Sequence, residues 1–169
     1  MIAAMKDVLL NQHYLNYFLF FLGINIGLRI SDLLALRVGD VRGKSHFVIT
    51  EQKTGKLERF KINSELQLHI SKYTIDKNTA VYLFQTRRSQ GHIHMVSVME
   101  DSQCCSSGGW MSEIGTHAPR KTFGYHFYQQ YKDVAVLQQI FNHSSPAETR
   151  RYIGINQDIM DEAFDGFSL

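Results

Sequence analysis

The sequence has little cysteine and no long uninterrupted apolar run. Its two cysteines, Cys104 and Cys105, are adjacent, so they cannot form a disulfide framework, and this favours a reducing cytoplasm. The longest apolar stretch, residues 14–28, is interrupted by two asparagines and two glycines and falls short of the about 20 residues that span a bilayer. No basic leader or cleavage site accompanies it, so we expect neither a signal peptide nor a membrane span. The stretch is typical of a buried helix.

Two kinds of catalytic site are also missing from the sequence. The acidic residues do not cluster as ligands for a pair of metal ions. No glycine-rich loop ends in Lys-Ser or Lys-Thr, the arrangement that cradles nucleotide phosphates. The sequence therefore predicts neither a metal nor a cofactor. What is present, 169 residues with 44% hydrophobic and 12% aromatic content, suffices for one core, and we expect a single domain over 1–169.

The net charge of +2 conceals an uneven distribution along the chain. Residues 153–169 contain four acidic residues and no lysine or arginine, so the remaining body has 18 basic and 12 acidic residues, a net charge of +6. A moderately basic body permits a polyanionic partner without requiring one. The acidic tail also carries apolar residues, and this pattern predicts a short amphipathic helix that docks in a groove. These apolar residues are Ile159, Met160, Phe164, Phe167 and Leu169.

Hydrophobic periodicity predicts a mainly helical chain with a small antiparallel sheet, the α+β class. Around Gly55, two segments that alternate apolar and polar residues predict a β-hairpin over 46–62 with a basic tip. Residues 91–111 show neither helical nor strand periodicity over a length that is unusual for a loop. Helices are expected over 4–22, from an N-capping Ser31 to Arg37, over 64–76, and over 117–141 as two helices joined near Lys132 and Asp133, with a strand or buried segment at 79–84.

Arg29, Lys53 and Lys56 are weak candidates for chemistry when each is taken alone. Arg29 lies just before a predicted helix start, where a surface arginine paired with Asp32 is the ordinary interpretation. Lys53 and Lys56 lie at the hairpin tip, where lysines are usually solvated.

Four further candidates lie in short polar motifs. In "THAPRKT", His117 and Arg120 are three residues apart on one face of a first helical turn, and Pro119 is tolerated there because first-turn amides need no intrahelical partner. His143 in "FNHSS" could simply cap a turn. Tyr152 in "TRRYIG" could be a core aromatic with a solvated hydroxyl.

Together these residues suit one substrate, a phosphodiester. Two arginines offer planar forks for phosphate oxygens, two histidines can donate hydrogen bonds, a lysine can give up a proton and a tyrosine can attack phosphorus. Their order and spacing resemble the catalytic domain of the tyrosine recombinases, the phage integrase family, over nearly the whole chain apart from 91–111. The matched positions are Arg29 in "GLRISDLLAL", Lys53 in "EQKTGK", His117 and Arg120 in "HAPRKT", His143 in "FNHSS", 23 residues after Arg120, and Tyr152 in "TRRYIG", nine residues after His143.

The resemblance implies a recombinase that cleaves and rejoins double-stranded DNA without metal or ATP. Tyr152 would attack a phosphate, form a 3'-phosphotyrosine and release a 5'-hydroxyl that later attacks the partner strand. Lys53 would be the general acid for the leaving oxygen, because the family lysine usually opens the Lys-Thr-Gly turn. Lys56 stays an alternative, since a flexible hairpin could present either lysine.

The resemblance also assigns the phosphate-binding groups. Arg29 and Arg120 would hold the nonbridging oxygens as charge builds, with His143 as a further donor. His117 would assist as an acid–base group or donor near the nucleophile. The resemblance implies a bacterial cytoplasmic protein at the nucleoid that self-associates on DNA through the tail at 153–169, because the family's final helix often packs onto a neighbouring protomer.

Some features depart from the family pattern. Asp32 stands where the family usually has Glu, Ala118-Pro119 where Leu commonly precedes the second arginine, and Asn142 where Gly usually precedes the histidine, although Asn tolerates the left-handed backbone. Full-length recombinases also have an N-terminal core-binding domain, which we expect to be absent, so that the chain is an excised domain or a truncated gene product.

Three alternatives therefore stay open. The first is a truncated or degenerate integrase remnant that binds DNA without turnover. The second is a type IB topoisomerase, which shares the chemistry. The third concerns 91–111 alone, which is either a frameshifted segment that has lost an expected amphipathic helix or an ordinary divergent loop.

Overall fold

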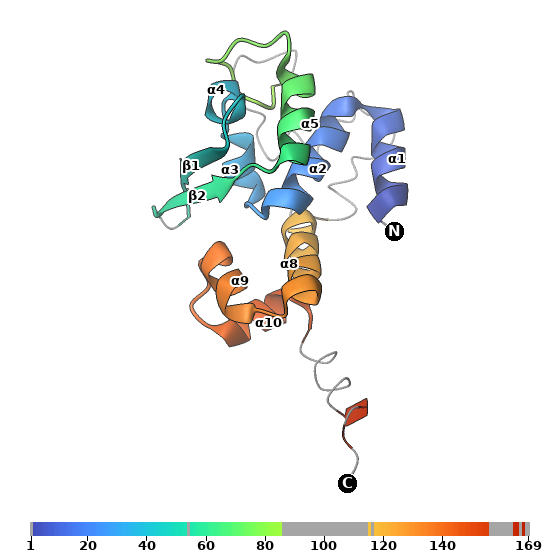
Figure 1. Ribbon diagram of the computed structural model, residues 1–169, viewed down its shortest axis with the longest axis vertical. Helices are drawn as coiled ribbons and strands as arrows, with labels where there is room; N and C mark the ends of the chain where they lie inside the picture. The colour runs from blue at the N-terminus through green and yellow to red at the C-terminus, as the bar shows by residue number, and fades with distance from the viewer. Residues whose placement is uncertain are drawn as a thin grey trace.

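A computed structural model describes residues 2–53, 55–85, 115, 117–155, 164, 165 and 167 (Figure 1). Most of these residues are helical, and two short strands form an antiparallel sheet, so the predicted α+β class is confirmed. The elements are α1 (Ile2–Gln12), α2 (Tyr14–Ile26), α3 (Ile30–Leu34), α4 (Val38–Val41), β1 (His46–Thr50), β2 (Leu57–Lys61), α5 (Ser64–Thr74), α8 (Ala118–Tyr131), α9 (Val134–Phe141) and α10 (Pro146–Ile153).

The prediction of one helix over 4–22 is wrong, because the chain forms two helices that meet at His13. The backbone of His13 is extended, and its Nδ1 accepts a hydrogen bond from the amide of Leu15 at 3.2 Å, which caps α2. Apolar residues continue across this junction, so periodicity does not reveal it. The middle of α2 is apolar on every face, and the helix is accordingly buried.

The helix predicted from Ser31 to Arg37 begins and ends earlier. α3 starts at Ile30, with Arg29 as its extended N-cap residue, and finishes at Leu34 before α4 forms as a separate turn. Ser31 is therefore not the N-cap. This shift matters for function because it places the backbone of Arg29 at the rigid start of a helix.

The predicted hairpin is confirmed. β1 and β2 pair antiparallel, with a register that runs from His46 opposite Lys61 to Thr50 opposite Leu57. Gly55 adopts a φ of +67° in the connecting turn, a conformation that L side chains rarely adopt. The turn therefore forms where the Lys-Thr-Gly-Lys sequence predicts it.

The segment at 79–84 was predicted as a strand or a buried segment, and it forms a connection with a buried end. Tyr82 forms only an isolated bridge to Arg37 within this part of the structure. Leu83 and Phe84 are fully buried. The apolar run therefore serves the core rather than a sheet.

The described residues bury two hydrophobic clusters, and α8 connects them. The larger cluster lies among α1–α5 and the hairpin, and the smaller one among α8, α9 and α10. Figure 1 shows α8 directly below α2, with α9 and α10 on the side of the hairpin turn. α8 starts against α2 because glycines allow close approach: a Cβ on Gly23 would lie 2.9 Å from Pro119 Cβ, and one on Gly27 would overlap the Phe123 ring.

Gly124 lets the small cluster close in the same way. A Cβ at this position would lie 2.8 Å from the Phe141 ring and 2.6 Å from Ile153 Cγ2. Because Gly124 has no Cβ, α9 and α10 can pack closely on α8. The turn that carries His143 and the helix that carries Tyr152 therefore both pack against α8. The predicted junction near Lys132 and Asp133 lies between α8 and α9, as expected.

Two expectations fall outside the described residues: those for 91–111 and for most of the tail. Of the tail, Phe164 and Phe167 are 75% and 67% exposed. Among the described helices, none combines the length and the hydropathy needed to cross a membrane.

Candidate active site

Arg29 and Arg120 direct their guanidinium groups at one carbonyl oxygen. The Nη2 atoms of Arg120 and Arg29 lie 2.9 Å and 3.5 Å from the backbone oxygen of Phe141, the last residue of α9. The Arg120 guanidinium also covers the Phe141 ring, 4.5 Å from its centroid. Two forks from segments far apart in the sequence therefore meet at the C-terminus of α9.

Buried carboxylates offset the two like charges, because Glu51 and Asp32 both raise the pKa of Arg120 against the effect of Arg29. Glu51, 1% exposed, forms an ion pair with Arg29 at 2.6 Å, and Asp32, 3% exposed, accepts a hydrogen bond from the Gln52 amide at 3.0 Å. Burial, with Arg29 as a second cause, lowers the pKa of Arg120 to about 10, so the group stays charged at neutral pH. The interpretation of Arg29 as a surface arginine paired with Asp32 is wrong, because its partner is Glu51.

His143 follows Asn142, the left-handed residue that ends α9. Its Nδ1 lies 3.1 Å from Thr149 Oγ1, and its carbonyl accepts a hydrogen bond from Gln138 at 3.1 Å. Burial lowers the pKa of His143; Glu148 opposes this shift, and Arg120 adds to it. The ring is therefore neutral at neutral pH and held between α9 and α10.

The lowered pKa of His143 makes stability depend on pH. Below the ordinary histidine value of about 6.5, protons bind the unfolded chain more readily than the folded one, so the free energy of unfolding should fall as the pH drops through that value towards the folded pKa. We expect His143→Asn, which can keep the bond to Thr149, to show a smaller fall between about pH 7 and 5 in urea titrations. An identical pH dependence in the variant and the parent protein would contradict this assignment.

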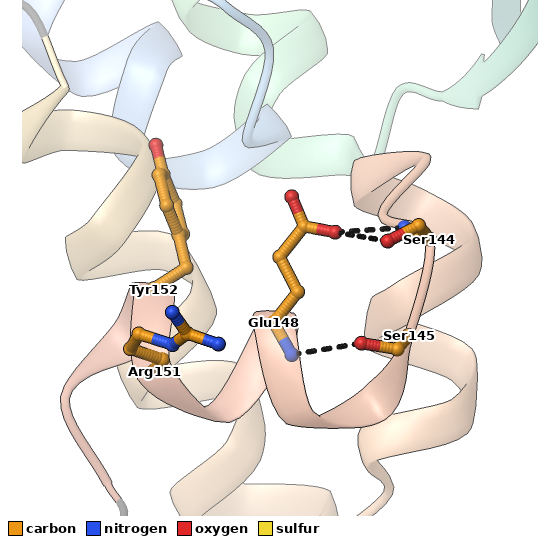
Figure 2. Close-up of a pocket in the computed structure, with 5 residues that line it drawn as sticks. All are labelled: Ser144, Ser145, Glu148, Arg151 and Tyr152. Atoms are coloured by element: carbon orange, nitrogen blue, oxygen red, sulfur yellow. Dashed lines mark hydrogen bonds between the residues drawn. The ribbon is translucent and has the colours of Figure 1, made fainter.

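Tyr152 stands on α10 beside these groups. Its ring meets those of Phe141 and His143 edge-on, with centroids 5.5 and 5.1 Å apart, and its hydroxyl lies 3.5 Å from His117 Nδ1. Burial raises the pKa of Tyr152, and Arg120 opposes the shift. The phenol is therefore protonated at rest, and Figure 2 shows its hydroxyl pointing away from α10.

The turn between His143 and Tyr152 is fixed by its own hydrogen bonds (Figure 2). Ser145 Oγ accepts from the Glu148 amide at 3.1 Å and caps α10. Glu148 Oε2 in return accepts from the amide and the hydroxyl of Ser144 at 2.9 and 2.8 Å. The polar residues of this stretch thus build a rigid turn, along which an open pocket reaches Tyr152.

The hairpin brings its lysines to the same place. Lys53 is exposed on the turn after β1, and its charge contributes to the lowered pKa of His143. Lys56 Nζ instead donates to Asn142 Oδ1 at 3.3 Å. No trio of His, Cys, Asp or Glu side chains within the described segments is arranged to hold a metal ion.

The structure therefore brings all six sequence-predicted positions to one region, and it adds residues that sequence reasoning missed. Phe141 supplies the carbonyl between the arginines and a ring that touches Arg120, His143 and Tyr152. Glu51 had no signal in the sequence beyond its place directly after the first strand of the predicted hairpin. Phe141 did have one, since it is the apolar residue that opens "FNHSS".

Comparison with known proteins places this geometry in a family. The model of the "Phage integrase family" matches residues 1–158. The chain belongs to the phage integrase family. It is 45% identical to "Probable integrase/recombinase YoeC" of Bacillus subtilis (strain 168), over 98% of this chain and 92% of YoeC.

Two solved structures share the fold. The crystal structure of XerA recombinase has a TM-score of 0.64 at 21% identity and is matched over 85% of this chain and 53% of XerA. The Tn1549 transposon integrase in complex with transposon right end DNA has a TM-score of 0.65 at 16% identity, over 89% of this chain and 58% of that one. This integrase-family chain spans between 45% and 49% of the length of three further curated tyrosine recombinases.

Proposed function

We propose that this integrase-family chain cleaves and rejoins double-stranded DNA in site-specific recombination, with Tyr152 as the nucleophile. One observation carries the proposal: the guanidinium groups of Arg29 and Arg120 converge beside the ring of His143 and the Tyr152 phenol. In such a set the arginines and the histidine can stabilise a pentacoordinate phosphate, and the tyrosine oxygen can attack the phosphorus. The YoeC name and the integrase–DNA complex among its structural neighbours support the same substrate.

In the proposed cleavage step, one phosphoester bond replaces another, so neither a metal nor a nucleotide is consumed. The Tyr152 oxygen forms a bond to phosphorus while the bond from phosphorus to the 5'-oxygen breaks. His117 Nδ1, 3.5 Å from the hydroxyl, is placed to accept the phenolic proton, and Lys53 gives a proton to the departing 5'-oxygen. A 5'-hydroxyl of the partner strand then attacks the phosphotyrosine and releases Tyr152, so the bond energy is conserved.

The phosphate oxygens would bind beside the Phe141 carbonyl, which stays part of the backbone. Arg29 and Arg120 already converge there, and within the described residues Arg120 Nη1 is buried without a hydrogen-bond partner, so a donor is available when an anion arrives. His143 adds a third donor once its Nε2 carries a proton, which requires Thr149 to donate to Nδ1 or the ring to be protonated.

Two other functions use the same residues. A remnant that binds DNA without turnover would not need a converged site, and the buried, bonded arginines favour activity over this alternative. A type IB topoisomerase shares the chemistry, but the similarity to an integrase/recombinase over 98% of the chain favours recombination. We place the protein in the bacterial cytoplasm, at the DNA.

The test is a nicked suicide DNA substrate, from which the short fragment that carries the released 5'-hydroxyl diffuses away, so that the covalent intermediate is trapped. Incubation followed by a denaturing gel should show a covalent protein–DNA adduct that forms in the presence of a chelator. DNA retention without an adduct would favour the remnant, and relaxation of supercoiled DNA without strand exchange would favour the topoisomerase.

We further propose that the tail assembles protomers. Phe164 and Phe167 are largely exposed, so they are not packed on the body that carries them, and the acidic tail complements a basic neighbour. Truncation after Ile155 should lower assembly on DNA, measured by analytical ultracentrifugation, while leaving the unfolding midpoint within a few degrees. The double variant Phe164→Ser, Phe167→Ser should reproduce the loss of assembly. Unchanged assembly in both proteins would show that the tail has no such role.

A further inference from the structure

One side chain links the hairpin to the turn that carries His143. Asn142 has φ 51° and ψ 42° at the end of α9, and its Nδ2 donates to Glu51 Oε2 at 3.0 Å and to Glu58 Oε1 at 2.8 Å. Its Oδ1 accepts from Lys56 Nζ at 3.3 Å. A single amide therefore contacts the end of β1, the turn and the start of β2.

Both ends of this link belong to the site. On one side, Asn142 immediately precedes His143. On the other, Glu51 pairs with Arg29 and lies two residues before Lys53. The amide thus connects the proposed general acid, one phosphate-binding arginine and the histidine.

The backbone alone does not explain the asparagine. The left-handed conformation at this position would suit glycine better. A glycine at this position would have no side-chain amide, however, so the bonds to Glu51 and Glu58 and the one from Lys56 would be lost. The hairpin would then lose this side-chain link to the end of α9.

We propose that Asn142 is a positioning residue that fixes the β1–β2 hairpin against the His143 turn and so holds Lys53 at the leaving oxygen. The structural part stands on the hydrogen bonds of Asn142. The chemical part rests on the proposed function, because Lys53 acts as a general acid only if DNA is cleaved.

Two variants separate the amide from the backbone. Asn142→Gly keeps the left-handed backbone and removes the amide, and Asn142→Asp keeps the shape but turns the donor into an acceptor that faces two carboxylates. Lys132→Gly is the matched control, because Lys132 is the other non-glycine residue with a left-handed backbone among the described residues and caps α8 instead. Lys53→Ala marks the effect of losing the general acid.

The first measurement needs no activity. Hydrogen–deuterium exchange of the hairpin amides should become at least about tenfold faster in Asn142→Gly, and faster still in Asn142→Asp, while α5 stays protected. The Lys132→Gly control should leave hairpin exchange unchanged. If the Asn142→Asp chain does not fold, the glycine variant decides alone, and unchanged hairpin exchange there overturns the inference whatever the protein does to DNA.

The second measurement identifies the proton transfer. In a DNA with sulfur at the bridging 5' position, the phosphorus–sulfur bond breaks and a thiolate leaves without a proton, since thiols are far more acidic than alcohols. On ordinary DNA, Asn142→Gly should slow adduct formation by about tenfold or more, and on the sulfur-containing DNA by less than about threefold, as for Lys53→Ala. Equal slowing of both substrates would overturn the role in positioning Lys53, whereas a parent protein that cleaves neither would overturn the proposed function and leave the exchange result to judge the hairpin contact.

Discussion

Tyr152→Phe should abolish the covalent protein–DNA adduct while leaving the fold and DNA affinity close to those of the parent protein. The change removes one oxygen and keeps the ring that packs edge-on against Phe141 and His143. The lost hydroxyl makes a 3.5 Å contact to an exposed histidine, so the free energy of unfolding should change by less than about 1 kcal/mol. A suicide-substrate gel and a DNA-binding titration measure the two effects on the same preparation.

Tyr125→Phe on α8 is the matched control, because Tyr125 is also partly exposed and lies outside the site. That variant should form the adduct at the parent rate. A tyrosine that served only packing would behave in the opposite way, with phenylalanine nearly neutral for activity. An adduct formed by Tyr152→Phe would therefore remove Tyr152 from the chemistry.

Arg120→Ala should slow adduct formation by about a hundred- to a thousandfold or more, the usual effect of deleting one donor that stabilises developing charge. Arg29→Ala should act in the same direction. Arg120 is 3% exposed and its guanidinium covers the Phe141 ring, so its loss also leaves a cavity. Circular dichroism and urea unfolding must therefore show that the variant is folded under the assay conditions.

Arg120→Lys separates charge from shape, because lysine keeps the cation but cannot present a planar fork. We expect the Arg120→Lys variant to form the adduct at a rate between those of the parent protein and Arg120→Ala. The Arg37→Ala variant, which loses an exposed arginine at the N-cap of α4, should form the adduct at the parent rate. Cleavage at the parent rate by a folded Arg120→Ala chain would contradict the phosphate-binding role.

Local sequence signals predicted correctly those elements that end at residues typical of turns. The hairpin around Gly55 and the junction between α8 and α9 form where their sequences predict. The division at His13 was missed because a histidine side chain caps α2 within an otherwise continuous apolar pattern. Ser31 was a plausible cap, but Arg29 takes that position.

The site was predictable only in part for a different reason. Residue types that carry phosphate chemistry stand out in a sequence, and their spacing resembles that of a known family. Glu51, Phe141 and the amide of Asn142 act through contacts between residues 91 and 112 positions apart in the sequence, and no local pattern reports such contacts. Periodicity predicts which residues are buried, but not which buried carboxylate will meet which arginine.

The two hydrophobic clusters of the described residues carry different parts of the site, which has a consequence for when cleavage can occur. Arg29 and Lys53 are carried by the larger core, whereas His143 and Tyr152 are carried by the smaller one on α8–α10. Small cooperative units open at lower free energy than the global transition. If α8–α10 opened before the larger core, His143 and Tyr152 would separate from Arg29 and Lys53. Under the proposed function, DNA cleavage would then require both clusters to be folded and packed together.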